Sequence, residues 1–401
     1  MKGRNLPMRI LIAPDSFKGS LTSRQVAAAM ARGVKRACPK AEVMCLPLAD
    51  GGEGTMEVLV AATGGRTVPV RVTGPLGEPV TAHYGVLGDE KTVVVELAAA
   101  SGLNLVPPER RDPLRASTYG TGELIRHAWE AGYRRFLIGL GGSATNDGGA
   151  GLLQALGVRL YDAEGQLLPP GGAALERLAR IEWPERDAWH AATVTVLCDV
   201  DNPLLGPRGA SRVFGPQKGA TPEMVDALER ALARWADVTA AFLGEDHRHR
   251  PGAGAAGGTG FALMAYLRAA VRPGIEAVME AVGFAEQASG ADLILTGEGK
   301  LDRQTLHGKT VAGVCRVAKD RGVPVIALAG AVELEGQDCD ALGLAGAFSI
   351  LSRPMTLSEA LAEGERLVEH AAEQVVRLWR HASRRANRME REGGRVPPET
   401  P

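Results

Sequence analysis

Polar, glycine-containing segments follow several apolar runs of this chain, and they hold the residues best suited to chemistry. The six segments are APDSFKGS (13–20), PLADGGEGT (47–55), GLGGSATNDGG (139–149), CDVDNPLLG (198–206), PGAGAAGGTG (251–260) and TGEGKLDRQT (296–305). Glycine lets backbone N–H groups approach phosphate oxygens, lysine neutralises developing charge, and Asp or Glu holds Mg²⁺ or accepts a hydroxyl proton. Together these residue types indicate a site for a metal ion and a nucleotide.

Standard nucleotide and nucleophile motifs do not account for these segments. HGKT (307–310) has the end of a Walker A loop, but Arg303 stands where its first glycine is required. The segment after the first predicted strand, PDSFKGS, lacks the G-x-G-x-x-G fingerprint of dinucleotide-binding proteins. Ser143 is not the centre of a G-x-S-x-G elbow, because Thr145 takes the final position.

The composition is that of a soluble globular protein, and its length of 401 residues suggests roughly two to three domains. A net charge of −1 gives no basic field for nucleic acid or for a membrane surface. No apolar run is long enough to span a bilayer. Five cysteines without a Cys-x-x-Cys pair fit a reduced, cytoplasmic setting.

The apolar patterns alternate between strands and helices at both ends of the chain. Residues 8–13 and 43–48 are predicted strands; Thr22 or Ser23 caps the helix between them, and a second helix covers 55–62. Residues 66–97 read as hairpins, and strand-helix alternation returns over 118–205. Thr221, with Pro222 at the first helical position, opens a long helix. The last elements are strands at 292–299, 323–329 and 346–351 and helices at 309–321 and 357–378.

This order predicts an α/β protein with a doubly wound, mostly parallel sheet domain of the flavodoxin or Rossmann type, built from both chain ends. We expect that domain to comprise residues 1–65 and 285–380, and a second α/β domain, residues 66–284, to be inserted. Residues 381–401 have almost no apolar side chains and are expected to form a disordered tail. The active site is expected near the carboxyl ends of the strands.

Nine segments, in order, resemble the bacterial glycerate kinase family, the type that usually makes 2-phosphoglycerate. They are APDSFKGSLTS, PLADGGEGT, ELAAASGL, STYGTGEL, GLGGSATNDGGAG, CDVDNPLLG, VFGPQKGA, PGAGAAGGTG and TGEGKLDRQTLHGK. The likeness runs from about Met8 to about residue 378. It implies phosphoryl transfer from ATP to D-glycerate with Mg²⁺, in a protein of two α/β domains, one doubly wound and one inserted.

Phosphoryl transfer needs a carboxylate near the attacking hydroxyl and cations on the transferred group, and three residues are the catalytic candidates. Asp199 is the candidate base, because the apolar run 194–198 places it at a strand end; capping of the next turn is the alternative. Lys18, before a helix amino end, would neutralise substrate or phosphate charge. Asp147 would orient metal or substrate, or would instead cap the helix that follows it.

The other candidates would bind substrate, phosphate or metal. The substrate and phosphate candidates are Asp15, Ser16, Asp50, Ser101, Ser143, Asn146, Lys218, Gly254, Gly257, Lys300 and Arg303. The metal candidates are Glu53, Glu298 and Asp302. If both chain ends share one sheet, the loop with Asp50 and Glu53 can face the loop with Glu298 and Asp302, beyond which lies Lys309.

The expected partners are D-glycerate and ATP, with no nucleic acid and no membrane, and the oligomeric state is left open between monomer and homodimer. A kinase for another small hydroxy acid is the near alternative. A dinucleotide-dependent oxidoreductase is disfavoured by the missing fingerprint. A non-catalytic small-ligand sensor would leave the carboxylates and lysines of so many strand-end loops without a purpose.

Overall fold

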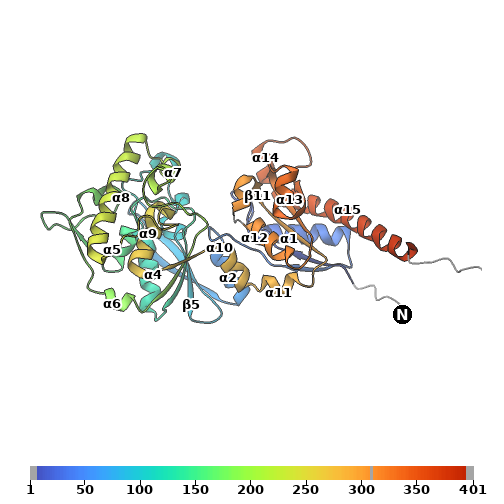
Figure 1. The fold of residues 1–401 in the computed structure, drawn as a ribbon, viewed down its shortest axis with the longest axis horizontal. Helices are drawn as coiled ribbons and strands as arrows, with labels where there is room; N and C mark the ends of the chain where they lie inside the picture. The colour runs from blue at the N-terminus through green and yellow to red at the C-terminus, as the bar shows by residue number, and fades with distance from the viewer. Residues whose placement is uncertain (1–6, 308–309, 394–401) are drawn as a thin grey trace, which may run out of the picture. The chain divides into compact units, whose positions relative to one another are not determined.

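The computed structural model describes residues 7–307 and 310–393 (Figure 1). Its contacts divide the chain into two compact units. The first unit combines the residues up to Leu48 with those from Gly283 onward, and the second comprises Ala49–Val282. No helix of the described residues is long and apolar enough to cross a membrane.

The first unit is built on a five-stranded sheet in the order β13-β12-β11-β1-β2, and every neighbouring pair is parallel. The strands are β1 (Arg9–Ile12), β2 (Glu42–Cys45), β11 (Leu293–Leu301), β12 (Val325–Val332) and β13 (Leu344–Ser349). The helices are α1 (Ser23–Ala37), α11 (Phe284–Ala288), α12 (Thr310–Lys319), α13 (Gly336–Leu342), α14 (Leu357–Ala362) and α15 (Gly364–Gly393), with a 3-10 turn, η5 (Arg303–His307). The expected parallel α/β domain assembled from both chain ends is confirmed.

Helix α1 shows how local sequence and packing agree in this unit. Thr22 caps the helix as expected, since its side chain accepts a hydrogen bond from the backbone N–H of Gln25 at 3.2 Å. The helix buries one apolar face and packs beside α15 (Figure 1). The two helices approach so closely that a Cβ on Gly33 would lie 2.2 Å from the carbonyl oxygen of Glu369.

The second unit contains a six-stranded sheet in the order β10-β9-β6-β5-β4-β3 and a two-stranded sheet. The strands are β3 (Arg66–Thr73), β4 (Pro79–Val86), β5 (Thr92–Glu96), β6 (Arg135–Gly139), β9 (Thr193–Leu197) and β10 (Ala270–Arg272), with β7 (Arg159–Tyr161) and β8 (Arg180–Glu182) forming the small sheet. The α-helices are α2 (Thr55–Thr63), α3 (Ala98–Ser101), α4 (Tyr119–Glu130), α5 (Ala150–Ala155), α6 (Arg186–Trp189), α7 (Ala210–Phe214), α8 (Pro222–Leu243), α9 (Ala255–Leu267) and α10 (Gly274–Ala281). The 3-10 turns are η1 (Leu103–Leu105), η2 (Pro108–Arg110), η3 (Gly172–Arg177) and η4 (Pro216–Lys218).

The register of the large sheet decides which loops meet at one edge. Strands β5, β6, β9 and β10 are parallel, so their carboxyl ends lie together. Strands β3, β4 and β5 are antiparallel neighbours, as the hairpin pattern predicts. Because β4 runs opposite to β5, the turn between β3 and β4 lies at this same edge.

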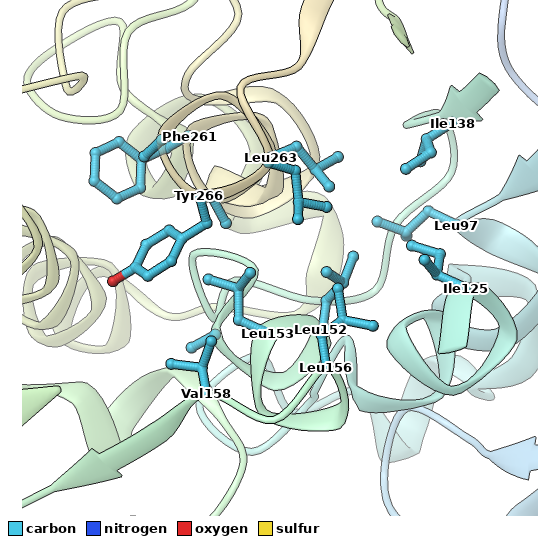
Figure 2. Close-up of a cluster of buried hydrophobic side chains, with 14 of the residues drawn as sticks. Leu97, Ile125, Ile138, Leu152, Leu153, Leu156, Val158, Phe261, Leu263 and Tyr266 are labelled. Carbon is cyan, nitrogen blue, oxygen red and sulfur yellow. The ribbon is translucent and has the colours of Figure 1, made fainter. Parts of the chain in front are cut away.

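The core of the second unit packs α5 against α9. Figure 2 shows Leu152 and Leu156 close to side chains of α9, among them Leu263. Tyr266 is buried as well, and its hydroxyl lies 3.0 Å from Thr239 Oγ1 of α8. Helix α8 begins at its predicted cap, Thr221. The core therefore holds in place the loops that precede α5 and α9.

Two parts of the chain differ from the sequence-based expectation. Helix α2 belongs to the second unit, whereas the patterns grouped it with the first, because it packs against β4 and β5. A Cβ on Gly85 of β4 would lie 2.5 Å from Val60 of α2. Helix α15 continues to Gly393, although residues 381–393 were expected to belong to a disordered tail. That stretch is rich in Arg, Glu and Ala, residue types with a high intrinsic preference for helix. The rest of the predicted tail, 394–401, lies outside the described residues.

Candidate functional site

The loop that joins β2 to α2 lies at the carboxyl ends of β6 and β9 in the second unit. A Cβ on Gly139 would lie 2.6 Å from the carbonyl oxygen of Gly51, and a Cβ on Gly274 would lie 2.1 Å from that of Asp50. Gly51 has a φ of +93°, and a Cβ there would lie 3.1 Å from the Cβ of Leu197. Only glycine allows these three segments to approach so closely.

This packing brings Asp50 and Asp199 to the same place. Asp199 Oδ1 accepts a hydrogen bond from the N–H of Gly274, the first residue of α10, at 3.0 Å. Asp50 Oδ1 accepts one from the N–H of Gly52 at 3.0 Å. The side chain of Asp199 is exposed and that of Asp50 is half-buried. Asp199 thus binds the first N–H of a helix distant in the chain, which differs from the expected capping of the turn that follows it. It also stands just after the end of β9, as a base at a strand end requires.

Glu53, a metal candidate, is exposed, and its Oε2 accepts a hydrogen bond from Asn104 Nδ2 at 3.2 Å. The loop of Asp50 and Glu53 therefore stands in the second unit beside Asp199. The glycines of the loop pack on β6, β9 and α10 and hold it there. The expectation that it faces Glu298, a residue of the first unit, stays a prediction.

Glu96, the last residue of β5, is a buried carboxylate that the sequence analysis did not select. Its Oε1 accepts a hydrogen bond from the N–H of Met56 in the first turn of α2 at 2.7 Å. Burial raises the pKa of Glu96 to about 7, and the nearby carboxylates of Glu53 and Glu57 act in the same direction. The sequence does contain a signal for Glu96: it is a carboxylate at the end of an apolar strand, and it opens the ELAAASGL segment.

The loop between β6 and α5 is organised around Asp147, which is fully buried. Its Oδ2 accepts hydrogen bonds from the N–H and Oγ1 of Thr118, both at 2.8 Å, and its Oδ1 accepts one from the N–H of Gly149 at 3.1 Å. Burial raises the pKa of Asp147, and these hydrogen bonds oppose the rise. The geometry favours the alternative in which Asp147 caps the helix that follows it, because Oδ2 also accepts the N–H of Gly151 in α5 at 3.2 Å. The bonds from Thr118 tie the same loop to the start of α4.

Ser101 and Ser143 lie in neighbouring segments at the same edge. Ser143 is buried and forms a β-bridge with Gly102. Ser101 is fully buried, and its Oγ lies 2.8 Å from Thr121 Oγ1 of α4. The contact of Ser101 is therefore with the helix behind the loop, which supports a packing role.

Lys218 is buried behind the same loop with only 1% of its surface exposed. Its Nζ donates a hydrogen bond to the carbonyl oxygen of Thr145 at 2.6 Å. Burial lowers the pKa of Lys218 to about 7, while Asp147 acts to raise it. Asn146 Nδ2 donates to Ser211 Oγ at 2.9 Å, so both Lys218 and Asn146 fasten the loop to the segment around α7 and η4.

Gly254 and Gly257 belong to the segment that opens α9. The N–H of Gly254 donates to the carbonyl oxygen of Asn202 at 2.8 Å. Gly257 has a φ of +65°, and a Cβ there would lie 2.1 Å from the carbonyl oxygen of Thr145. Its own carbonyl oxygen accepts a hydrogen bond from the N–H of Gly148 at 2.9 Å. These glycines hold two polar loops against each other.

In the first unit, Asp15 and Glu298 are two buried carboxylates on neighbouring segments: Asp15 follows β1, and Glu298 lies within β11. Asp15 Oδ1 accepts from the N–H of Ser16 at 2.6 Å, and Oδ2 accepts from Thr310 Oγ1 at 2.5 Å. Glu298 Oε1 accepts from Thr305 Oγ1 at 2.7 Å. The two strands meet here, because the N–H of Asp15 donates to the carbonyl oxygen of Gly297 at 2.8 Å.

Lys18 is exposed beside this pair, and a Cβ on Gly299 would lie 3.5 Å from its backbone nitrogen. Lys300 Nζ lies 2.9 Å from Glu333 and 3.6 Å from Asp302, so it forms a small ion-pair network. Arg303 is exposed in η5. Lys309 lies outside the described residues.

Each of the two large sheets has carboxylates near the carboxyl ends of its strands, and carboxylate oxygens are ligands that Mg²⁺ prefers. Within 7–307 and 310–393, no group of three or more His, Cys, Asp or Glu is placed to hold a metal ion. Mg²⁺ in phosphoryl-transfer sites is usually held by one or two carboxylates together with substrate phosphates. The pair Asp15 and Glu298 fits that donor set.

Comparisons with known proteins confirm the family that the polar loops indicate. The model of the Glycerate kinase family matches residues 10–380. Glycerate kinase of Bacillus subtilis (strain 168) is 50% identical over 374 residues, which cover 93% of this chain and 96% of that protein. Glycerate 2-kinase of Escherichia coli (strain K12) is 48% identical over 354 residues, or 88% of this chain and 93% of that protein. A crystal structure named for glycerate kinase 2 of Salmonella typhimurium LT2 superposes with a TM-score of 0.82 at 48% identity and covers 94% of this chain and 100% of that one.

Proposed function

The chain belongs to the glycerate kinase family, and we propose that it transfers the γ-phosphoryl group of ATP to D-glycerate and forms 2-phosphoglycerate. The observation that carries this proposal is the family match over residues 10–380, because it spans all of the polar loops described above. Glycerate 2-kinase of Escherichia coli, among the relatives, supports the 2-phosphorylated product.

Asp199 is the residue we propose as the base that accepts the proton of the attacking hydroxyl. The end of β9 holds its backbone, and the N–H of Gly274 fixes one carboxylate oxygen at 3.0 Å. The exposed side chain can be reached by a substrate at the sheet edge. A positioned carboxylate is sufficient for phosphoryl transfer, which depends on alignment and charge more than on covalent chemistry.

The glycerate carboxylate would lie against the backbone amides at the start of the loop between β6 and α5. That start is close to the loop of Asp50, since a Cβ on Gly141 would lie 2.7 Å from the Cα of Gly52. Asp147, Lys218 and the glycines of the 254–258 segment would keep these amides in position. Amides fixed before the substrate arrives stabilise an anion without reorganisation.

Asp15 and Glu298 are the residues we propose to hold Mg²⁺ with the nucleotide phosphates, and the fit rests on two buried carboxylates on adjoining segments of the sheet. When bound, Mg²⁺ neutralises charge on the phosphates. Lys18, exposed on the first loop after β1, would place an ammonium group on the same phosphates. Thr305 and Thr310 orient the two carboxylates through their hydroxyl groups.

The function is tested by incubating the full chain with ATP, Mg²⁺ and D-glycerate and identifying the product by phosphorus NMR. We expect the 2-phosphate ester. A 3-phosphate ester would contradict the proposed regiochemistry. A panel of small hydroxy acids under the same conditions would refute D-glycerate as substrate if another acid gave a higher kcat/KM.

A further inference from the structure

A groove of about 730 Å³ lies within the second unit, and none of its lining residues has a role in the proposed kinase site. One of them, Ser117, lies 3.4 Å from Asp147 through its hydroxyl group. Three segments form it: the turn between β3 and β4 (73–77), the residues leading into α4 (114–119), and the stretch around η3 (169–177). The turn between β3 and β4 lies at the same sheet edge as the candidate active site. A volume of this size suits a small-molecule ligand.

The groove combines apolar walls with positive charge. Pro75, Pro169 and Pro170 contribute rigid apolar surface, and Arg115 and Arg177 contribute two exposed side chains. Neither guanidinium forms a hydrogen bond or an ion pair with any residue in the described part of the chain. Exposed arginines just outside the groove do have partners: Arg180 pairs with Glu182, and Arg230 with Glu176.

The two guanidiniums are the source of anion attraction in this groove, because the amino end of α4 is already occupied. Thr118 donates its N–H to the buried Asp147, and Ser117 Oγ accepts the N–H of Tyr119 at 3.1 Å. The nearby carboxylate of Glu123 is likewise engaged, since its Oε2 accepts the N–H of Thr73 at 2.6 Å. The carboxylates of Asp147 and Glu123 therefore accept backbone N–H groups, and Arg115 and Arg177 are the charged residues that line the groove.

We propose that this groove binds a small organic phosphate, with the phosphate held by Arg115 and Arg177. Guanidinium groups match phosphate oxygens in geometry and charge. The ring of Tyr119 and the three prolines would cover a planar or apolar body attached to the phosphate. The ligand is therefore an ester with an apolar portion rather than free phosphate, and its site is separate from the loops of Asp50 and Asp199.

Phenyl phosphate is a suitable probe because it carries the phosphate and a planar apolar body but no nucleotide. Isothermal titration of the full chain at pH 8 should show saturable binding, and benzyl alcohol, which lacks the charge, should not bind. Arg115→Gln and Arg177→Gln should each weaken binding by about tenfold, the effect of losing a hydrogen bond to a charged group. Arg180→Gln, an exposed arginine outside the groove, is the matched control and should bind as the wild type does.

Turnover of ATP and D-glycerate, measured on the same preparations, separates this site from the kinase site. The double variant R115Q/R177Q should lose phenyl phosphate binding and keep turnover within about twofold of the wild type, since neither side chain belongs to the proposed kinase site. Unchanged binding in the double variant would overturn the proposal. So would loss of turnover together with loss of binding, because the probe would then have occupied the kinase site. Absence of kinase activity in the wild type would refute the proposed function and leave the binding measurement intact.

Discussion

Lys218 offers a quantitative test of how strongly the second unit desolvates a charge. The side chain is buried with 1% of its surface exposed, and its ammonium group donates to the carbonyl oxygen of Thr145. The substitution Lys218→Met keeps an unbranched side chain and removes the charge. It also removes the partner of Thr145, which costs about 1–3 kcal/mol at any pH. The pH dependence, rather than the absolute difference, therefore carries the prediction.

The magnitude follows from the pKa of Lys218, which burial lowers from 10.5 to about 7. Between those two pH values the unfolded chain binds a proton that the folded chain has released, so the free energy of unfolding rises with pH. The slope approaches about 1.4 kcal/mol per pH unit well above the folded pKa. Integrated from pH 7 to pH 9, the wild type should gain about 2 kcal/mol relative to Lys218→Met. This contribution is lost again as the pH falls through the folded pKa.

Tryptophan fluorescence during urea unfolding is the appropriate assay. Four of the five tryptophans, Trp129, Trp183, Trp189 and Trp235, belong to the second unit, so the signal reports mainly on the unit that holds Lys218. Midpoints and slopes would be compared at pH 7, 8 and 9 for the wild type and the variant.

Lys91→Met is the matched control, because Lys91 is an exposed lysine of the same unit. That variant should track the wild type over the same pH range, since water surrounds the side chain in the folded and the unfolded chain. If the free energy of unfolding of Lys218→Met changed with pH in the same way as that of the wild type, Lys218 would not be desolvated in the folded protein, and the reasoning would be refuted.

Three further predictions concern the sheet edge of the second unit. Asp199→Asn should lower kcat by about 10²–10⁴-fold while thermal unfolding stays unchanged, because an amide oxygen still accepts from Gly274 but takes no proton; near-normal turnover would remove Asp199 as the base. Glu96→Gln should gain stability relative to the wild type as the pH rises from 5 to 8, by about 2–3 kcal/mol in total. The reason is that burial raises the pKa of Glu96 from 4.5 to about 7, so the wild type must ionise a buried group over this range. Melting temperatures of the two proteins that shift together with pH would contradict this prediction. Gly274→Ala should lower the free energy of unfolding by more than about 3 kcal/mol and reduce turnover, because its Cβ would lie 2.1 Å from the carbonyl oxygen of Asp50. Gly336→Ala is the control: no atom lies within 4 Å of a Cβ there, and the free energy of unfolding should change by less than about 0.5 kcal/mol.

Several features of this protein could be predicted from the sequence because they depend on residues close together in the chain. The alternation of apolar runs and amphipathic helices predicts a parallel α/β domain, and the sheet β13-β12-β11-β1-β2 confirms it. The caps of α1 and α8 follow from Thr22 and Thr221 alone, since a cap needs only a side-chain oxygen and the next few N–H groups. The ordered set of polar loops was enough to indicate the family.

The tertiary structure decided what each polar side chain meets. The loop of Asp50 lies beside Asp199, because glycines at 51, 139 and 274 let distant backbones touch. Asp147 and Lys218 look like any acid and base of a glycine-rich loop until packing buries them, after which their partners are hydrogen-bonding groups behind the loop. Local patterns predict which elements form, because caps and periodicity act over a few residues. Burial, close backbone approach and the resulting pKa values arise only when segments tens to hundreds of residues apart exclude water from one another.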